Sequence, residues 1–196
     1  ITPYYSIAND NEEPCSNNNN NEEDGFCPVN NNNNNLQTIG GDNNNDDQDA
    51  CSFIAQAIFA DIPVFDMLLI NQGTCGNHLD IEQGLFDHHT AAALLPYRNE
   101  LIALRLLGKH IAMALEHGVH ANLLGIVDAT PKTAGVRYQV DMSQPKGQRV
   151  SNVEVLKHDC TYQPMHMEQA YTVLTNEYLA SGGDGYGVFA MMAKSK

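Results

Sequence analysis

The N-terminal half of the sequence lacks positive charge. The first Lys or Arg among the 196 residues is Arg98. Residues 1–97 contain fifteen Asp and Glu, whereas residues 98–196 contain nine acidic residues and all ten basic ones. With a formal net charge of −14, the chain has no basic surface for a nucleic acid, and an anionic membrane would repel it. Weak, diffuse binding of cations such as Ca²⁺ is the interaction that this charge favours.

Long apolar runs, Cys-x-x-Cys pairs and Asn-x-Ser/Thr sequons are also absent. We therefore expect no membrane span, no zinc ribbon and no N-glycosylation site. Five cysteines suit an oxidising compartment, with two disulfides and one cysteine left over. Because the opening ITPYY has neither an initiating Met nor a signal peptide, we expect a processed protein that is secreted, periplasmic or extracellular. The cysteines are Cys15, Cys27, Cys51, Cys75 and Cys160.

Residues 1–48 form an acidic segment of low complexity, rich in asparagine runs. Such a composition buries little apolar surface and predicts mobility. A Cys15–Cys27 bridge would pin the segment, and the asparagine runs could also stand in for residues of unknown identity. From residue 49 onward the composition is that of a globular domain, so we divide the chain into residues 1–48 and 49–196.

The domain at residues 49–196 shows a mixture of helix and strand signals. Helices are predicted at residues 50–60, capped by Asp49, and at 109–118, ended by Gly118. Strands are predicted at residues 64–70, 101–106, 136–140, 150–156 and 171–176. Since strict alternation of strand and helix is missing, we expect an α+β fold with a mixed sheet and packed helices.

A glycine-rich stretch at residues 175–189, TNEYLASGGDGYGVF, is the strongest candidate for a binding loop. Gly182 and Gly183 permit positive φ and a close approach of the backbone to a ligand. Asp184 can accept two neighbouring hydroxyls, and Tyr178 can offer a ring face to a planar group. A sugar attached to a flat base would use all three features. The alternative is a glycine turn between packed elements, with Tyr178 and Tyr186 in the core.

Three segments together resemble the C-terminal domain of the 5′-nucleotidase family. They are LLPYRNELIALRLLGKHIAMALEHGV (94–119), GVRYQVDMSQPKGQRVSNVEVL (135–156) and YTVLTNEYLASGGDGYGVF (171–189). Their order and spacing match as well as their residues, and the resemblance covers roughly residues 49–192. It implies a domain that binds an adenine-type nucleoside or nucleotide, while a separate metallophosphatase domain holds two metal ions and hydrolyses the phosphate. On this basis the chain itself needs no cofactor.

The resemblance also implies site residues. The two rings that hold the base map to Tyr97 and Tyr178, and each stacked ring is worth about 1–3 kcal/mol. The acid that binds the ribose maps to Asp184. The asparagine that precedes the family's glycine-rich loop maps to Asn71.

Two phosphate-binding arginines of the family have no counterpart in this sequence. Gly76 stands where the first is expected, and no arginine precedes Arg98. Losing both should remove charge-assisted bonds worth about 1.5–3 kcal/mol each. Arg98, beside Tyr97, is either a partial substitute or a solvent-exposed side chain.

Histidine-containing strings near residues 76–89 resemble metal-binding sequences of phosphoesterases. They are Gly-Asn-His at 76–78 and Asp-His-His at 87–89. His78, Asp80, His88 and His89 are the candidate ligands for a transition metal, although surface exposure is the default interpretation. The other histidines, including His117 near the end of its predicted helix, need no function.

Two functions therefore remain open. In the first, the chain is the nucleotide- or nucleoside-recognition domain of a 5′-nucleotidase-like hydrolase, non-catalytic by itself, with a catalytic-domain chain as partner. In the second, it is a secreted structural, matrix or assembly protein that self-assembles and binds cations through its acidic N-terminal segment. The missing arginines favour the second function, whereas Tyr97, Tyr178 and Asp184 favour the first.

Overall fold

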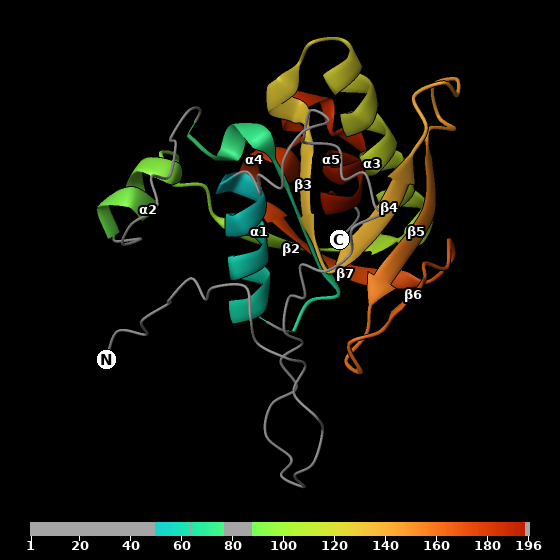
Figure 1. The fold of residues 1–196 in the computed structure, drawn as a ribbon, viewed down its shortest axis with the longest axis horizontal. Helices are drawn as coiled ribbons and strands as arrows, with labels where there is room; N and C mark the ends of the chain where they lie inside the picture. Colours follow the sequence, from blue (N-terminus) through green and yellow to red (C-terminus); the bar gives the residue numbers. More distant parts are fainter. Residues whose placement is uncertain (1–49, 63, 77–87, 195–196) are drawn as a thin grey trace, which may run out of the picture.

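A four-stranded mixed sheet forms the centre of the fold in a computed structural model, which describes residues 50–62, 64–76 and 88–194. The strand order is β2-β7-β1-β3 (Figure 1). The two central strands, β1 and β7, run parallel, and both outer pairings are antiparallel. The strands are β1 (Met67–Asn71), β2 (Leu101–Leu107), β3 (Pro131–Ala134) and β7 (Ala170–Asn176).

Both faces of this sheet are covered, and strand β1 shows how. Every residue of β1 is buried. Successive side chains of a strand point to opposite faces, so the burial of all five means that both faces of the sheet are covered at β1. Leu68 and Ile70 pack with the residues of helix α1 (Ala50–Asp61). Met67 and Leu69 instead join the larger core under helices α3 (Gly108–Leu123) and α5 (Gly187–Ala193). A continuous apolar strand is thus the sequence expected at the centre of a covered sheet.

A second, antiparallel sheet with the order β4-β5-β6 extends the larger core. Its strands are β4 (Val136–Val140), β5 (Val150–Leu156) and β6 (Tyr162–Pro164). The chain passes from β3 to β4 through Gly135, which has a φ of +73°. Alternate residues of this sheet, including Tyr138 and Val155, are buried with α3.

Five short elements complete the described part of the chain. They are α2 (His88–Leu94), η1 (Gln72–Thr74), η2 (Val127–Ala129), α4 (Glu177–Ala180) and η3 (Gly183–Gly185). Helix α2 lies away from the two sheets at the edge of the view (Figure 1). The other four elements surround the carboxyl ends of β1 and β7. None of the described helices is long and apolar enough to cross a membrane.

The structure confirms the expected α+β class and most of the predicted elements. The helix at 50–60 and the strands at 101–106, 136–140, 150–156 and 171–176 are present, within one residue at either end. The strand predicted at 64–70 begins only at Met67. The helices α2, α4 and α5 and the short strands β3 and β6 were not predicted. Asp49, predicted as the cap of α1, lies outside the described residues.

Gly118 does not end its helix, contrary to the prediction, since α3 continues to Leu123. The glycine serves packing instead. A Cβ at this position would lie 2.5 Å from the Tyr186 hydroxyl and 2.6 Å from Pro131 Cδ. A side chain is absent here because helix, strand and buried tyrosine approach one another closely.

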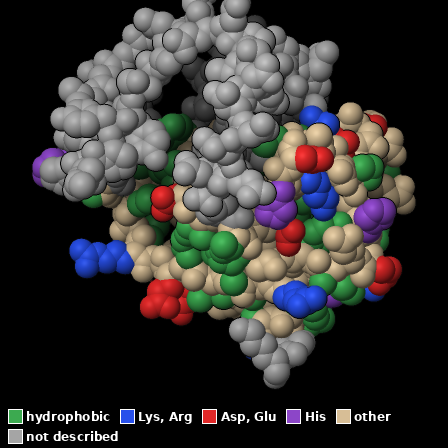
Figure 2. Space-filling view, turned by 90° about the horizontal axis from the view of Figure 1, so that it is seen from below, with side chains coloured by type: hydrophobic (Ala, Val, Ile, Leu, Met, Phe, Trp, Pro, Cys, Tyr) green, Lys and Arg blue, Asp and Glu red, His purple; other side chains and the backbone are tan. Residues whose placement is uncertain are grey.

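Acidic and basic side chains are interspersed on the face of the molecule seen from below (Figure 2). This mixture agrees with the near balance of charges in residues 98–196. The excess negative charge lies in the N-terminal half of the sequence, which is largely outside the described residues.

The substitution Gly118→Ala should destabilise the fold by about 1–3 kcal/mol, because the added methyl group overpacks the contact with Pro131 and Tyr186. Gly187→Ala is the matched control, since a Cβ there meets nothing within 4 Å. Urea unfolding of both variants checks this. An equal loss of stability in the two would contradict the packing role of Gly118.

Candidate functional site

The candidate site lies where the parallel strands β1 and β7 end. Asn71 is the last residue of β1, and Asn176 is the last residue of β7. Because the carboxyl ends of parallel strands meet at one edge of a sheet, the two amides come together there. Both are almost completely buried, with 3% and 1% of their surface exposed.

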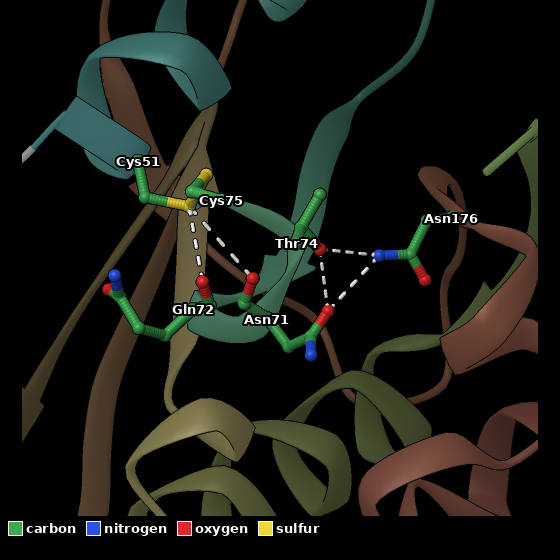
Figure 3. Close-up of a disulfide and its surroundings, with 6 residues drawn as sticks. All are labelled: Cys51, Asn71, Gln72, Thr74, Cys75 and Asn176. Carbon is green, nitrogen blue, oxygen red and sulfur yellow. Dashed lines mark hydrogen bonds between the residues drawn. A yellow bond between two sulfur atoms is a disulfide. The ribbon is translucent and has the colours of Figure 1, made fainter. Parts of the chain in front are cut away.

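Hydrogen bonds determine which way the Asn71 amide faces (Figure 3). Asn71 Oδ1 accepts from Thr74 Oγ1 at 2.6 Å and from Asn176 Nδ2 at 3.1 Å. Asn176 Nδ2 also donates to Thr74 Oγ1 at 2.7 Å. Since the oxygen is occupied by two donors, Nδ2 must point the other way. It donates to Asp184 Oδ2 at 2.7 Å.

Asn176 has a second role as the N-cap of α4. Its Oδ1 accepts from the backbone N–H of Leu179 at 2.8 Å. This is the usual way in which an asparagine starts a helix. One amide therefore orients Asn71 and also fixes the helix that carries Tyr178.

Tyr178 and Asp184 form a reciprocal pair. The Tyr178 hydroxyl donates to Asp184 Oδ1 at 2.7 Å and accepts from the Asp184 backbone N–H at 3.2 Å. The hydrogen bond to the carboxylate stabilises the protonated phenol and is the main reason why the pKa of Tyr178 is raised. Both Asp184 carboxylate oxygens thus have a protein donor.

His117 of α3 holds the backbone of the same loop. Its Nε2 lies 2.7 Å from the Asp184 carbonyl oxygen, and its ring meets that of Tyr186 edge-on, with the centroids 5.0 Å apart. Asp184 itself has a φ of +49°, which is uncommon for a residue other than glycine. A Cβ at the following Gly185 would lie 2.8 Å from the imidazole, so the glycine allows the ring to approach.

The sequence analysis missed His117, Thr74 and Asn176 as contributors to the site. Asn176 could have been found, because an asparagine directly before a short helical segment is a capping signal. No local pattern connects His117 with Asp184 or Thr74 with Asn176, since each of these contacts joins residues far apart in the chain.

Tyr97 and Tyr178 leave the sheet at the same edge. Strands β2 and β7 pair antiparallel with Leu101 opposite Asn176, and the Glu177 N–H donates to the Glu100 carbonyl at 2.8 Å. The two residues are 62% and 44% exposed, so neither side chain belongs to the core. Tyr186, by contrast, is fully buried. This agrees with the alternative interpretation of the glycine-rich stretch, which placed Tyr186 in the core.

Gly182 and Gly183 differ in what they provide. Gly182 has a φ of +97° and takes the left-handed conformation that the sequence suggested. Gly183 does not belong to the residues with positive φ. A Cβ at Gly183 would lie 2.5 Å from the Tyr178 ring, so this glycine makes room for the aromatic side chain.

The loop that follows β1 is anchored by the Cys51–Cys75 disulfide. Cys51 Sγ lies 3.9 Å and 3.8 Å from the carbonyl oxygens of Asn71 and Gln72 (Figure 3). These are close contacts, because a disulfide sulfur has no proton to donate. Cys160 is disulfide-bonded as well. The suggested Cys15–Cys27 bridge lies outside the described residues.

Gly76, at the expected place of a phosphate-binding arginine, has no room for a side chain. Its N–H donates to the Leu94 carbonyl at 2.8 Å. A Cβ would lie 2.6 Å from the Ala93 carbonyl oxygen and 3.7 Å from Pro96. The loop from Asn71 to Gly76 thus contacts Asp184 at one end and the segment that leads to Tyr97 at the other.

The metal candidates are only partly within the described residues. His78 and Asp80 lie outside them. His88 is the first residue of α2, and His89 is exposed. Within residues 50–62, 64–76 and 88–194, no group of three or more His, Cys, Asp or Glu side chains is placed to hold a metal ion. The described side chains therefore do not fit the two-metal centre of a metallophosphatase.

Comparison with known families identifies the fold. The family described as "5′-nucleotidase, C-terminal domain" matches residues 29–193. The chain belongs to the 5′-nucleotidase family. The match begins before residue 49, so the boundary between residues 48 and 49 stays a prediction. This family assignment agrees with the resemblance carried by the three sequence segments.

Two curated relatives show how much of a family member the chain represents. A snake venom 5′-nucleotidase from Naja atra is 33% identical over 61% of this chain. An NAD 5′-nucleotidase from Haemophilus influenzae is 32% identical over 73% of it. The matches span only 23% and 24% of those proteins, so the chain corresponds to about a quarter of their length.

Comparison with solved structures agrees with this family assignment. The structure of an NAD nucleotidase from Haemophilus influenzae has a TM-score of 0.66 and 28% identity, covering 74% of this chain and 26% of that one. A 5′-nucleotidase precursor from Thermus thermophilus has a TM-score of 0.62 and 29% identity, covering 71% and 27%. The mixed sheet with its helices is thus the family's C-terminal fold.

Asp184→Asn should lower the pKa of Tyr178 towards its ordinary value. The neutral amide is a weaker acceptor for the phenolic proton, and asparagine tolerates the positive φ at this position. Ultraviolet difference titration, with Tyr178→Phe used to isolate the signal, measures the shift. Asp141→Asn, in an exposed turn, is the control. An unchanged titration of Tyr178 would refute the Tyr178–Asp184 bond.

Proposed function

We propose that this chain is the nucleoside-recognition domain of a 5′-nucleotidase-like hydrolase. The observation that carries the proposal is the cluster of Asn71, Tyr178 and Asp184 at one sheet edge, with Tyr97 leaving the same edge. In this proposal an adenine-type base lies between the two tyrosine rings, and the sugar is bound by Asp184. The names of the relatives, which describe enzymes acting on nucleotides, support the class of ligand.

Aromatic stacking supplies the affinity for the base. Both rings are exposed enough to meet a ligand, yet each leaves from a fixed edge of the sheet. The packing of Tyr178 against Gly183 limits its freedom before the ligand arrives. A ring that is already ordered loses less conformational entropy on binding.

Recognition in this site is directed at the base and sugar more than at phosphate. Gly76 cannot carry the arginine expected there, because the Ala93 carbonyl fills the space of a Cβ. Asp128 of η2 approaches the same loop, since a Cβ at Gly73 would lie 3.1 Å from Asp128 Cβ. A second acid beside the loop disfavours a phosphate group. Adenosine should therefore bind about as tightly as AMP.

Hydrolysis is assigned to another part of the protein or to a partner. The described residues do not assemble a set of metal ligands, so the proposal gives them no catalytic residue. Two metal ions elsewhere would activate water and stabilise the charge on the phosphate. In this view a catalytic domain is the partner of the described domain.

We also propose that the protein works in an oxidising compartment, secreted, periplasmic or extracellular. All three cysteines in the described part of the chain, Cys51, Cys75 and Cys160, are disulfide-bonded. Disulfides persist mainly in such compartments. The venom relative points in the same direction.

Replacing either proposed stacking residue should weaken adenosine binding. Tyr178→Ala and Tyr97→Ala are each expected to cost about 1–3 kcal/mol of binding free energy, the value of one stacked ring. Isothermal titration calorimetry with adenosine and AMP measures both variants. Met113→Ala, an exposed residue of α3 outside the site, is the control. If Tyr178→Ala binds adenosine as the unaltered chain does, the stacking assignment is wrong.

A further inference from the structure

The Tyr178 hydroxyl has a place in the site that is separate from the ring's stacking. It donates its only proton to Asp184 Oδ1 at 2.7 Å, and its oxygen accepts from the Asp184 N–H at 3.2 Å. A hydroxyl bound on both sides in this way cannot turn to a ligand without breaking one of the two bonds. Its proton is therefore committed to the carboxylate.

The acceptor capacity of Asp184 is divided accordingly. A carboxylate offers about four lone-pair sites, two on each oxygen. Tyr178 occupies one site on Oδ1, and the Asn71 amide occupies one on Oδ2 at 2.7 Å. One site is left on each oxygen. Two adjacent acceptors in a fixed plane match two hydroxyl donors on neighbouring carbon atoms.

We infer that the Tyr178 hydroxyl is a positioning group, which sets the Asp184 carboxylate to receive a vicinal diol and so makes the site selective for ribonucleosides. This inference rests on the proposed function and adds the role of the phenolic oxygen. Without the hydroxyl, Oδ1 loses its internal donor, and the carboxylate can rotate away from the plane that the diol needs. The Asp184 N–H loses its acceptor at the same time.

The test compares two ligands that share the base. Adenosine carries the vicinal 2′- and 3′-hydroxyls, and 2′,3′-dideoxyadenosine lacks both while keeping the 5′-hydroxyl. Tyr178→Phe keeps the ring and removes only the hydroxyl. Because one hydrogen bond makes only a modest net contribution to a free energy, the affinity for adenosine should fall about threefold to tenfold. Affinity for the dideoxynucleoside should stay unchanged, since that ligand makes no use of the carboxylate.

Two controls separate positioning from a general structural effect. Tyr162→Phe, on β6 outside the site, makes the same chemical change where its ring stacks on Arg137, and should alter neither affinity. In the Asp184→Asn background, Tyr178→Phe should have no further effect on adenosine binding, because coupled residues are not additive. Urea unfolding confirms that each variant is folded.

The outcomes distinguish the positioning role of the Tyr178 hydroxyl from the proposed function on which it rests. Equal weakening of both ligands by Tyr178→Phe, or no weakening of adenosine, would overturn the inference and leave nucleoside binding intact. Failure of the unaltered chain to bind either ligand would overturn the proposed function and the inference together. A selective loss of adenosine affinity that disappears in the Asp184→Asn background supports both.

Discussion

The orientation of one buried amide, that of Asn71, is the constraint on which the candidate site depends. Its oxygen is held by Thr74 and Asn176, so its nitrogen faces Asp184. A buried amide with unpaired groups would be costly, and the network leaves Asn71 one arrangement that satisfies its oxygen and its nitrogen together. A single polar cluster thereby joins the ends of the two central strands, the start of α4 and the loop that carries Asp184. The central sheet fixes the ends of β1 and β7, and the asparagines at these ends hold the Asp184 carboxylate in place.

Close backbone approach is the second constraint, and it determines what the site can recognise. Gly183 admits the Tyr178 ring, and Gly185 admits His117. Gly76 admits the Ala93 carbonyl, and in doing so excludes the arginine expected at that position. The Cys51–Cys75 disulfide anchors the same loop to α1. The geometry that joins the loop to both aromatic segments thus favours a flat base and a sugar over a phosphate.

The sequence was informative where a signal is local and incomplete where contacts are distant. The strands β1, β4, β5 and β7 were predicted from their own residues, because the alternation or run of apolar residues that marks a strand acts over a few positions. The helix end at Gly118 was predicted wrongly, since the same residue serves a close contact with Pro131 and Tyr186. Tyr178 and Asp184 were named from the glycine-rich stretch, and the family resemblance added Tyr97 and Asn71. His117 and Thr74 were missed, because only the folded chain brings His117 to Asp184 and Thr74 to Asn176.

A crystal structure of the chain soaked or co-crystallised with adenosine tests the central claim most directly. The account predicts the base against the Tyr178 ring, with the 2′- and 3′-hydroxyls of the ribose within hydrogen-bond distance of the Asp184 carboxylate. It also predicts that the bonds from Tyr178 and Asn71 to Asp184 persist in the complex. Adenosine bound with its sugar away from Asp184, or bound elsewhere on the domain, would contradict the account.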